Sequence, residues 1–83
     1  MQDLTDIQQF IDFAEKELQV QGLSPQSEFR KISSWSSLNA LLFISGVNEH
    51  ADVLISSADL ASCTTLGDIH SLIVNRIHGF STN

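Results

Sequence analysis

The 83-residue chain has few basic side chains and an excess of acidic ones. Four Lys and Arg residues face ten Asp and Glu residues, which gives a formal net charge of −6. Nucleic acids are bound largely by neutralising their phosphates with Lys and Arg, and anionic membranes attract basic segments. The sequence therefore disfavours both as partners, and complementary charge favours a partner with a basic docking surface.

The chain also lacks a second cysteine, a long apolar run and a secretion signal. The lone Cys63 cannot form an internal disulfide, which fits a reducing compartment. No apolar run approaches the ~20 residues that span a bilayer, and the first residues lack a positive start followed by an apolar centre. We therefore expect a cytoplasmic protein with no membrane insertion.

The apolar residues that are present suffice for one small core. Hydrophobic residues make up 42% of the chain, and a domain of this size buries roughly 60–65% of its unfolded surface. Apolar residues recur at helical spacing in four segments, about residues 5–18, 37–49, 57–62 and 66–78. We expect a single all-α domain over residues 1–83, with a long first loop and a short third helix, and these connections would permit an up-down arrangement of the helices.

The expected helix boundaries rest on capping residues. Ser, Thr and Asp accept hydrogen bonds from the free amides of a first helical turn, and glycine ends helices. Residues 22–35, which contain Gly22 and Pro25, form the long loop, with a possible helical turn at residues 28–32. The predicted caps are the pair Thr5 and Gln8, then Ser36, the pair Ser56 and Asp59, the pair Thr65 and Asp68, and Gly79 at the end of the last helix.

The second helix is apolar on two sides, and a single small core cannot easily cover both of them. One stripe consists of Ala40, Phe43, Ile44, Val47 and Ala51, and we assign it to the core. The other consists of Leu38, Leu41, Leu42 and Ser45. We expect this second stripe to face outward as an interaction site, and the alternative is that the long loop buries it.

Ser37 is the candidate modification site. If Ser36 caps the second helix, Ser37 is its first residue, and its hydroxyl points to solvent at the positive end of the helix dipole. Free amides and the dipole both favour a phosphate attached there. We expect Trp35 to be a hydrophobic anchor that fixes the loop before this position.

The stretch Trp35-Ser36-Ser37-Leu38 resembles the modification site of acyl carrier proteins, which commonly reads Asp-Ser-Leu. Residues 53–56 and 64–69 resemble the segments before the third and fourth helices of that family. The resemblance implies 4'-phosphopantetheine on Ser37, holding acyl groups as thioesters. It also implies a small antiparallel four-helix bundle, and a monomeric non-enzyme of lipid or polyketide-type biosynthesis. The implied partners are a phosphopantetheinyl transferase and an acyl-activating ligase, ketosynthase or acyltransferase.

Two features depart from that family. Ser36 replaces the usual acid, and the second helix, which is typically acidic, offers only Glu49. We therefore expect partners to dock more by apolar contact than by charge, on Leu38, Leu41, Leu42, Ser45 and Glu49. Two alternatives remain open: a small acidic helical interaction module in which Ser37 is only a helix cap, and a degenerate carrier that the transferase cannot modify.

Other chemistry is less well supported by the sequence. His50, His70 and His78 accompany no nucleophile elbow, and with Cys63 they match no zinc spacing, so we predict no catalytic or metal site. Residues 30 and 31, a paired basic site, are either a solvated loop edge or neighbours of the phosphate of the arm. A cavity for an acyl chain is expected between the inner stripes of the first, second and fourth helices.

Overall fold

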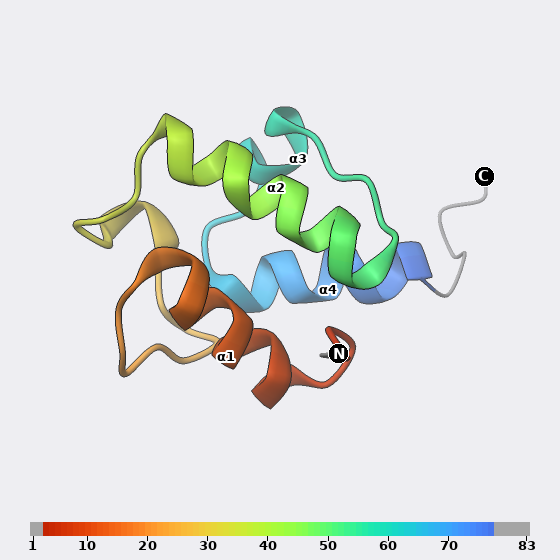
Figure 1. The fold of residues 1–83 in the computed structure, drawn as a ribbon, viewed down its shortest axis with the longest axis horizontal. Coiled ribbons are helices and arrows are strands. Elements are labelled where there is room, and N and C mark those ends of the chain that lie inside the picture. The colour runs from red at the N-terminus through yellow and green to blue at the C-terminus, as the bar shows by residue number, and fades with distance from the viewer. Residues whose placement is uncertain (1–2, 78–83) are drawn as a thin grey trace.

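The computed structural model describes residues 3–77, which are mostly helical and contain no strand. The elements are α1 (Ile7–Leu18), the 3-10 helix η1 (Phe29–Lys31), α2 (Ser37–Ala51), α3 (Ser57–Ala61) and α4 (Leu66–Ile77). Figure 1 shows α2 lying across the molecule above α4, with the short α3 close to α2. None of the helices in this part of the chain is long and apolar enough to cross a membrane. The prediction of an all-α protein is therefore confirmed for the described residues.

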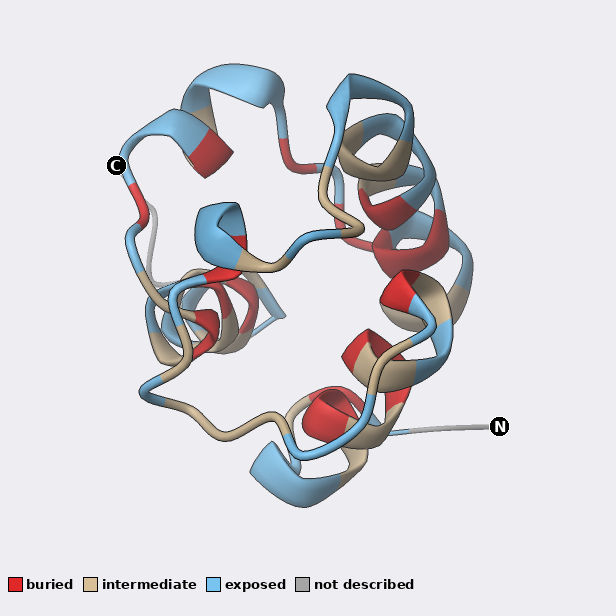
Figure 2. Ribbon diagram, turned by 90° about the vertical axis from the view of Figure 1, so that its left-hand side faces the viewer, coloured by how far each residue is buried: buried red, intermediate tan, exposed pale blue. Residues whose placement is uncertain are grey.

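The core is built around three phenylalanine rings from α1 and α2. Phe10 and Phe13 lie with ring centroids 6.3 Å apart, and Phe43 lies 6.1 Å from the first and 5.3 Å from the second. All three are fully buried, and Ile69 and Ile73 of α4 complete the same cluster. Figure 2 shows the buried stretches of α1, α2 and α4 turned toward the middle of the molecule. These rings occupy the place between the inner stripes where the sequence suggested an acyl cavity.

The first helix begins later than predicted. The N-cap is Asp6, whose carboxylate accepts hydrogen bonds from the amides of Gln8 and Gln9 at 2.9 and 3.2 Å. The predicted Thr5–Gln8 box is wrong because both the amide and the hydroxyl of Thr5 donate to the Asp3 carboxylate.

The remaining described caps agree with the sequence. Ser36 caps α2, and Ser56 with Asp59 forms a capping box on α3. Asp68 accepts from the Thr65 amide at 3.1 Å, while its own amide donates to the Thr65 hydroxyl at 3.2 Å. Helix α2 runs two residues past the predicted end, and the predicted end at His78 and the stop at Gly79 lie outside the described residues.

The long loop is fastened to the start of α4. The amide of Leu66 donates to the carbonyl of Ser27 at 3.0 Å, and the amide of Gly67 donates to the carbonyl of Pro25 at 2.8 Å. A Cβ at Gly67 would lie 3.0 Å from that same Pro25 oxygen, so glycine permits the approach. The predicted helical turn in this loop is η1. The loop therefore satisfies free amides of α4 while it positions the residues that precede α2.

The connector between α2 and α3 alternates in burial. Val53 and Ile55 are buried, whereas Leu54 between them is 74% exposed. An apolar run such as residues 53–55, with no partner strand, is expected from the sequence to be a buried connector, and this expectation is wrong for Leu54. An extended backbone points successive side chains to opposite sides, so the middle residue of three faces solvent.

Candidate functional site

The first turn of α2 leaves the Ser37 hydroxyl free and exposed. The N-cap is Ser36, whose Oγ accepts from the Asn39 amide at 3.3 Å and donates to the Asn39 side-chain oxygen at 2.7 Å. Ser37 is the first helical residue, and its hydroxyl makes no hydrogen bond with any described residue. The alternative in which Ser37 is the helix cap is therefore wrong, because Ser36 is the N-cap.

The neighbouring serines differ from Ser37 in their contacts. Ser34 donates its hydroxyl to the carbonyl of Leu18, the last residue of α1, at 2.7 Å. Ser33 is exposed and, within the described residues, makes no hydrogen bond through its hydroxyl, but it lies in the loop rather than on a helix. Of the four serines around Trp35, Ser37 is thus the free hydroxyl that also sits at a helix start.

Trp35 anchors the loop before α2, as predicted. Its ring lies 4.9 Å from the Phe29 ring and 6.2 Å from the Phe43 ring, both edge to face. Aromatic pairs in this arrangement are favourable beyond the area they bury. The indole therefore packs on the core and does not cover the exposed Ser37.

The second stripe of α2 forms an exposed apolar surface, which we call the leucine face: Leu38, Leu41, Leu42 and Ser45. Its three leucines are 65%, 60% and 49% exposed, and Ser45 is exposed as well. The alternative that the long loop buries them is wrong, since the apolar residues of the loop pack on the core instead: Phe29 is buried in it, and Leu23 and Ile32 are half-buried against it. An exposed cluster of large apolar residues usually marks an interaction site.

The charges around α2 are sparse. Its first turn carries no acidic residue, and Glu49 near its end is exposed. Lys31 forms an exposed ion pair with Glu28 at 3.5 Å. Arg30 instead donates to the carbonyls of Cys63 and Leu60 at 2.7 and 2.5 Å. The two basic residues of the loop therefore have different environments.

A hollow of about 190 Å³ opens within one turn of Ser37. It lies between η1, α2 and α3. One of its lining residues, Ala40, is three positions after Ser37, and residues three apart are neighbours on a helix surface. The lining consists of Phe29, Arg30, Trp35, Ala40, Ser57, Leu60 and Ala61.

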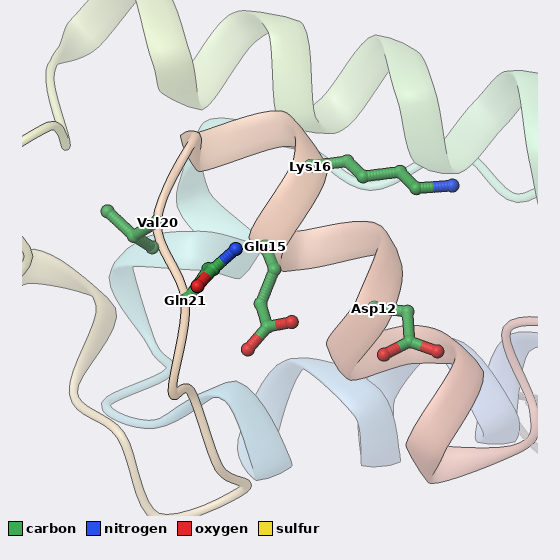
Figure 3. Close-up of a pocket in the computed structure, with 5 residues that line it drawn as sticks. All are labelled: Asp12, Glu15, Lys16, Val20 and Gln21. Carbon is green, nitrogen blue, oxygen red and sulfur yellow. The ribbon is translucent and has the colours of Figure 1, made fainter.

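A second hollow, of about 290 Å³, lies beside the end of α1 (Figure 3). It is lined by Asp12, Glu15, Lys16, Val20 and Gln21. The Glu15 carboxylate accepts from the Leu23 amide at 3.0 Å, and Asp12 accepts from the Gln8 side chain at 3.2 Å. These carboxylates therefore make local contacts within the chain.

The histidines and the cysteine of the described region contact or are buried by other parts of the fold. His70 Nε2 lies 2.9 Å from the Thr5 carbonyl oxygen, and the His50 ring packs edge to face on Phe13. Cys63 is buried, and burial raises the pKa of its thiol. Between residues 3 and 77, no three His, Cys, Asp or Glu side chains are grouped so as to hold a metal. His78 lies outside that range.

The sequence singled out Arg30 only as half of a basic pair, and its hydrogen bonds to the carbonyls of Leu60 and Cys63 were not predicted. Its partners are 30 and 33 positions away in the chain, so no local pattern shows them.

No protein-family model, curated protein or solved structure matches the chain.

Proposed function

We propose that this protein is an acyl carrier that holds acyl groups as thioesters on 4'-phosphopantetheine attached to Ser37. The observation that carries the proposal is the exposed, unbonded hydroxyl of Ser37 at the first position of α2. The free amides and dipole of that helix end favour the negative phosphate of such an arm. The chain needs no activating base of its own, because a phosphopantetheinyl transferase would supply one.

The partners of this carrier dock on the leucine face. Leu38, Leu41 and Leu42 follow Ser37 directly on the same helix, so an enzyme that reaches the arm also covers them. The absence of acidic residues in the first turn of α2 favours apolar over charge-driven docking. The expected occupants are the transferase and an acyl-activating ligase, ketosynthase or acyltransferase.

The proposal also covers the arrangement of the helices, the oligomeric state and the cellular compartment. The four helices form the antiparallel bundle of the carrier family, and the protein is a cytoplasmic monomer that presents cargo rather than catalysing a reaction. The rival is a helical interaction module, which the leucine face alone would also serve. Modification of Ser37 distinguishes the two, since only the carrier needs its hydroxyl.

The test is the intact mass of the protein after incubation with coenzyme A and a broad-specificity phosphopantetheinyl transferase. A carrier gains the mass of one phosphopantetheine, and Ser37→Ala does not. Ser33→Ala is the matched control, because Ser33 is also exposed and unbonded, and it retains the adduct. No adduct with several transferases, or an adduct that survives Ser37→Ala, overturns the proposal.

A further inference from the structure

The hollow beside Ser37 contains a positive charge that no carboxylate neutralises. Arg30 is the one charged residue of its lining. The two ion pairs of the described chain join Lys31 to Glu28 and Arg76 to Asp59, so neither involves Arg30. In a protein with net charge −6, the exposed Arg30 guanidinium, which lines the hollow and has no ion-pair partner, is a local exception that favours an anionic group.

Contacts with its neighbours fix the Arg30 side chain but leave some of its N–H donors free. Its two terminal nitrogens donate to the carbonyls of Leu60 and Cys63, and its guanidinium carbon lies 4.7 Å from the centre of the Phe29 ring. A guanidinium has more N–H donors than these two, and its planar fork matches a carboxylate. The fixed side chain therefore keeps donors free at no further cost in rotamer entropy.

The remaining lining combines large apolar residues with small ones. Phe29 and Trp35 pack edge to face, while Ala40 and Ala61 leave space. An apolar cavity of about 150 Å³ holds a benzene molecule, so about 190 Å³ accommodates a short chain of roughly six to eight heavy atoms. The hollow thus combines room for a short aliphatic chain with a cation for its end.

We propose that this hollow binds a short acyl group that ends in a carboxylate, with Arg30 receiving the carboxylate and Trp35 packing on the chain. This inference rests on the proposed function, because the acyl group arrives on the arm at Ser37. It narrows the cargo to short dicarboxylic acyl groups.

The test attaches the ligand chemically, so that it does not depend on a transferase. The thiolate of a Ser37→Cys variant attacks the symmetric disulfide of 6-mercaptohexanoic acid, forming a mixed disulfide and releasing one thiol. The disulfide of 6-mercaptohexanol gives a neutral adduct of equal length. Buried Cys63 is protected from the reagent. The readouts are the emission of Trp35, the single tryptophan, and the melting temperature.

The acid adduct is expected to melt about 4 °C or more above the alcohol adduct and to shift the Trp35 emission. Ala61→Leu, which fills the hollow but retains Arg30, abolishes both differences. Ala58→Leu is the matched control, an exposed alanine of the same helix that does not line the hollow, and it retains them. Arg30→Gln, with circular dichroism to verify folding, also abolishes them.

Equal behaviour of the two adducts, or persistence of the difference in Ala61→Leu, overturns the inference. Failure of transferase loading with success of this test would reject the carrier but keep the site. A saturable response of the unmodified protein to submillimolar free hexanoate would assign the hollow to a free acid and reject the cargo assignment.

Discussion

Ser36 and Asn39 exchange two hydrogen bonds across the first turn of α2. The Ser36 hydroxyl donates to the Asn39 side-chain oxygen at 2.7 Å and accepts from its amide at 3.3 Å. Under the proposed carrier function, Ser36 occupies the position where acyl carrier proteins commonly have an acid, and it caps the helix as an Asp carboxylate would. The neighbouring Ser37 hydroxyl consequently has no role in the helix cap.

Ser36→Asp is expected to preserve the cap and to speed modification of Ser37. Aspartate is an equally good N-cap, and its charge suits the helix start. We expect the melting temperature to change little and the initial rate of phosphopantetheine transfer to rise about fivefold. Ser36→Ala, in comparison, loses about 1 kcal/mol of stability. A rate that is unchanged or lower in Ser36→Asp would show that the serine is no handicap.

Leu41→Ser is expected to weaken partner docking without destabilising the protein. Leu41 is 60% exposed, so the free energy of unfolding should change by no more than about 0.5 kcal/mol. Burial of this side chain under the transferase would be lost, which lowers kcat/KM about tenfold. Leu54→Ser is the matched control, since Leu54 is 74% exposed and lies beyond the end of α2. Equal effects of the two substitutions would exclude a specific leucine face.

Gly46→Ala is expected to destabilise the protein although alanine favours helices. A Cβ at Gly46 would lie 2.9 Å from Phe13 Cζ, and that ring is fixed by its contacts with Phe10 and Phe43. Overpacking of this kind costs about 1–3 kcal/mol, against a gain of about 1 kcal/mol in helix propensity. Urea unfolding measures the difference, with the exposed Ser45→Ala as control. A raised denaturation midpoint in Gly46→Ala would show that α1 and α2 are not in close contact there.

Acid should destabilise the wild type more than Asp59→Asn. The Ser56 amide holds the pKa of the Asp59 carboxyl below its usual value, with Arg76 3.1 Å away as a further cause. A lowered folded-state pKa means stability that is present above the unfolded value of about 4 and is lost as pH falls through the folded one.

The free energy of unfolding from pH 7 to pH 2 checks this expectation. Asp59→Asn should be less stable by about 1 kcal/mol at pH 7, because the capping box is weakened, and the gap should close below pH 4. Asp3 and Asp68, whose pKa values are also lowered by hydrogen bonds, are common to both proteins and cancel. A gap that stays constant with pH would mean that the Asp59 charge contributes nothing.

Local signals predicted much of the fold. Helix periodicity and the caps at Ser36, Ser56 and Thr65 located the starts of α2, α3 and α4, because a cap is formed by residues two or three positions apart. The same reasoning predicted Thr5 in place of Asp6 as the N-cap of α1, because it did not consider the competing hydrogen bond from Thr5 to Asp3. The two stripes of α2 were assigned to core and surface as the structure has them.

Long-range features could not be predicted in this way. The clamp of Arg30 on Leu60 and Cys63 and the bonds of Pro25 and Ser27 to the start of α4 join distant parts of the chain. The hollow lined by Trp35 and Ala61 is formed by residues of elements that are distant in the chain, so periodicity gave no sign of it. The exposed Ser37 was predictable because it depends on one helix end alone.

Fragmentation of the intact protein after transferase treatment locates the phosphopantetheine among the serines that surround Trp35, with no residue substituted. The account predicts that every modified fragment places the group on Ser37 and none on Ser33, Ser34 or Ser36. A group on another serine, or a protein that stays unmodified at full transferase activity toward a control carrier, would contradict it.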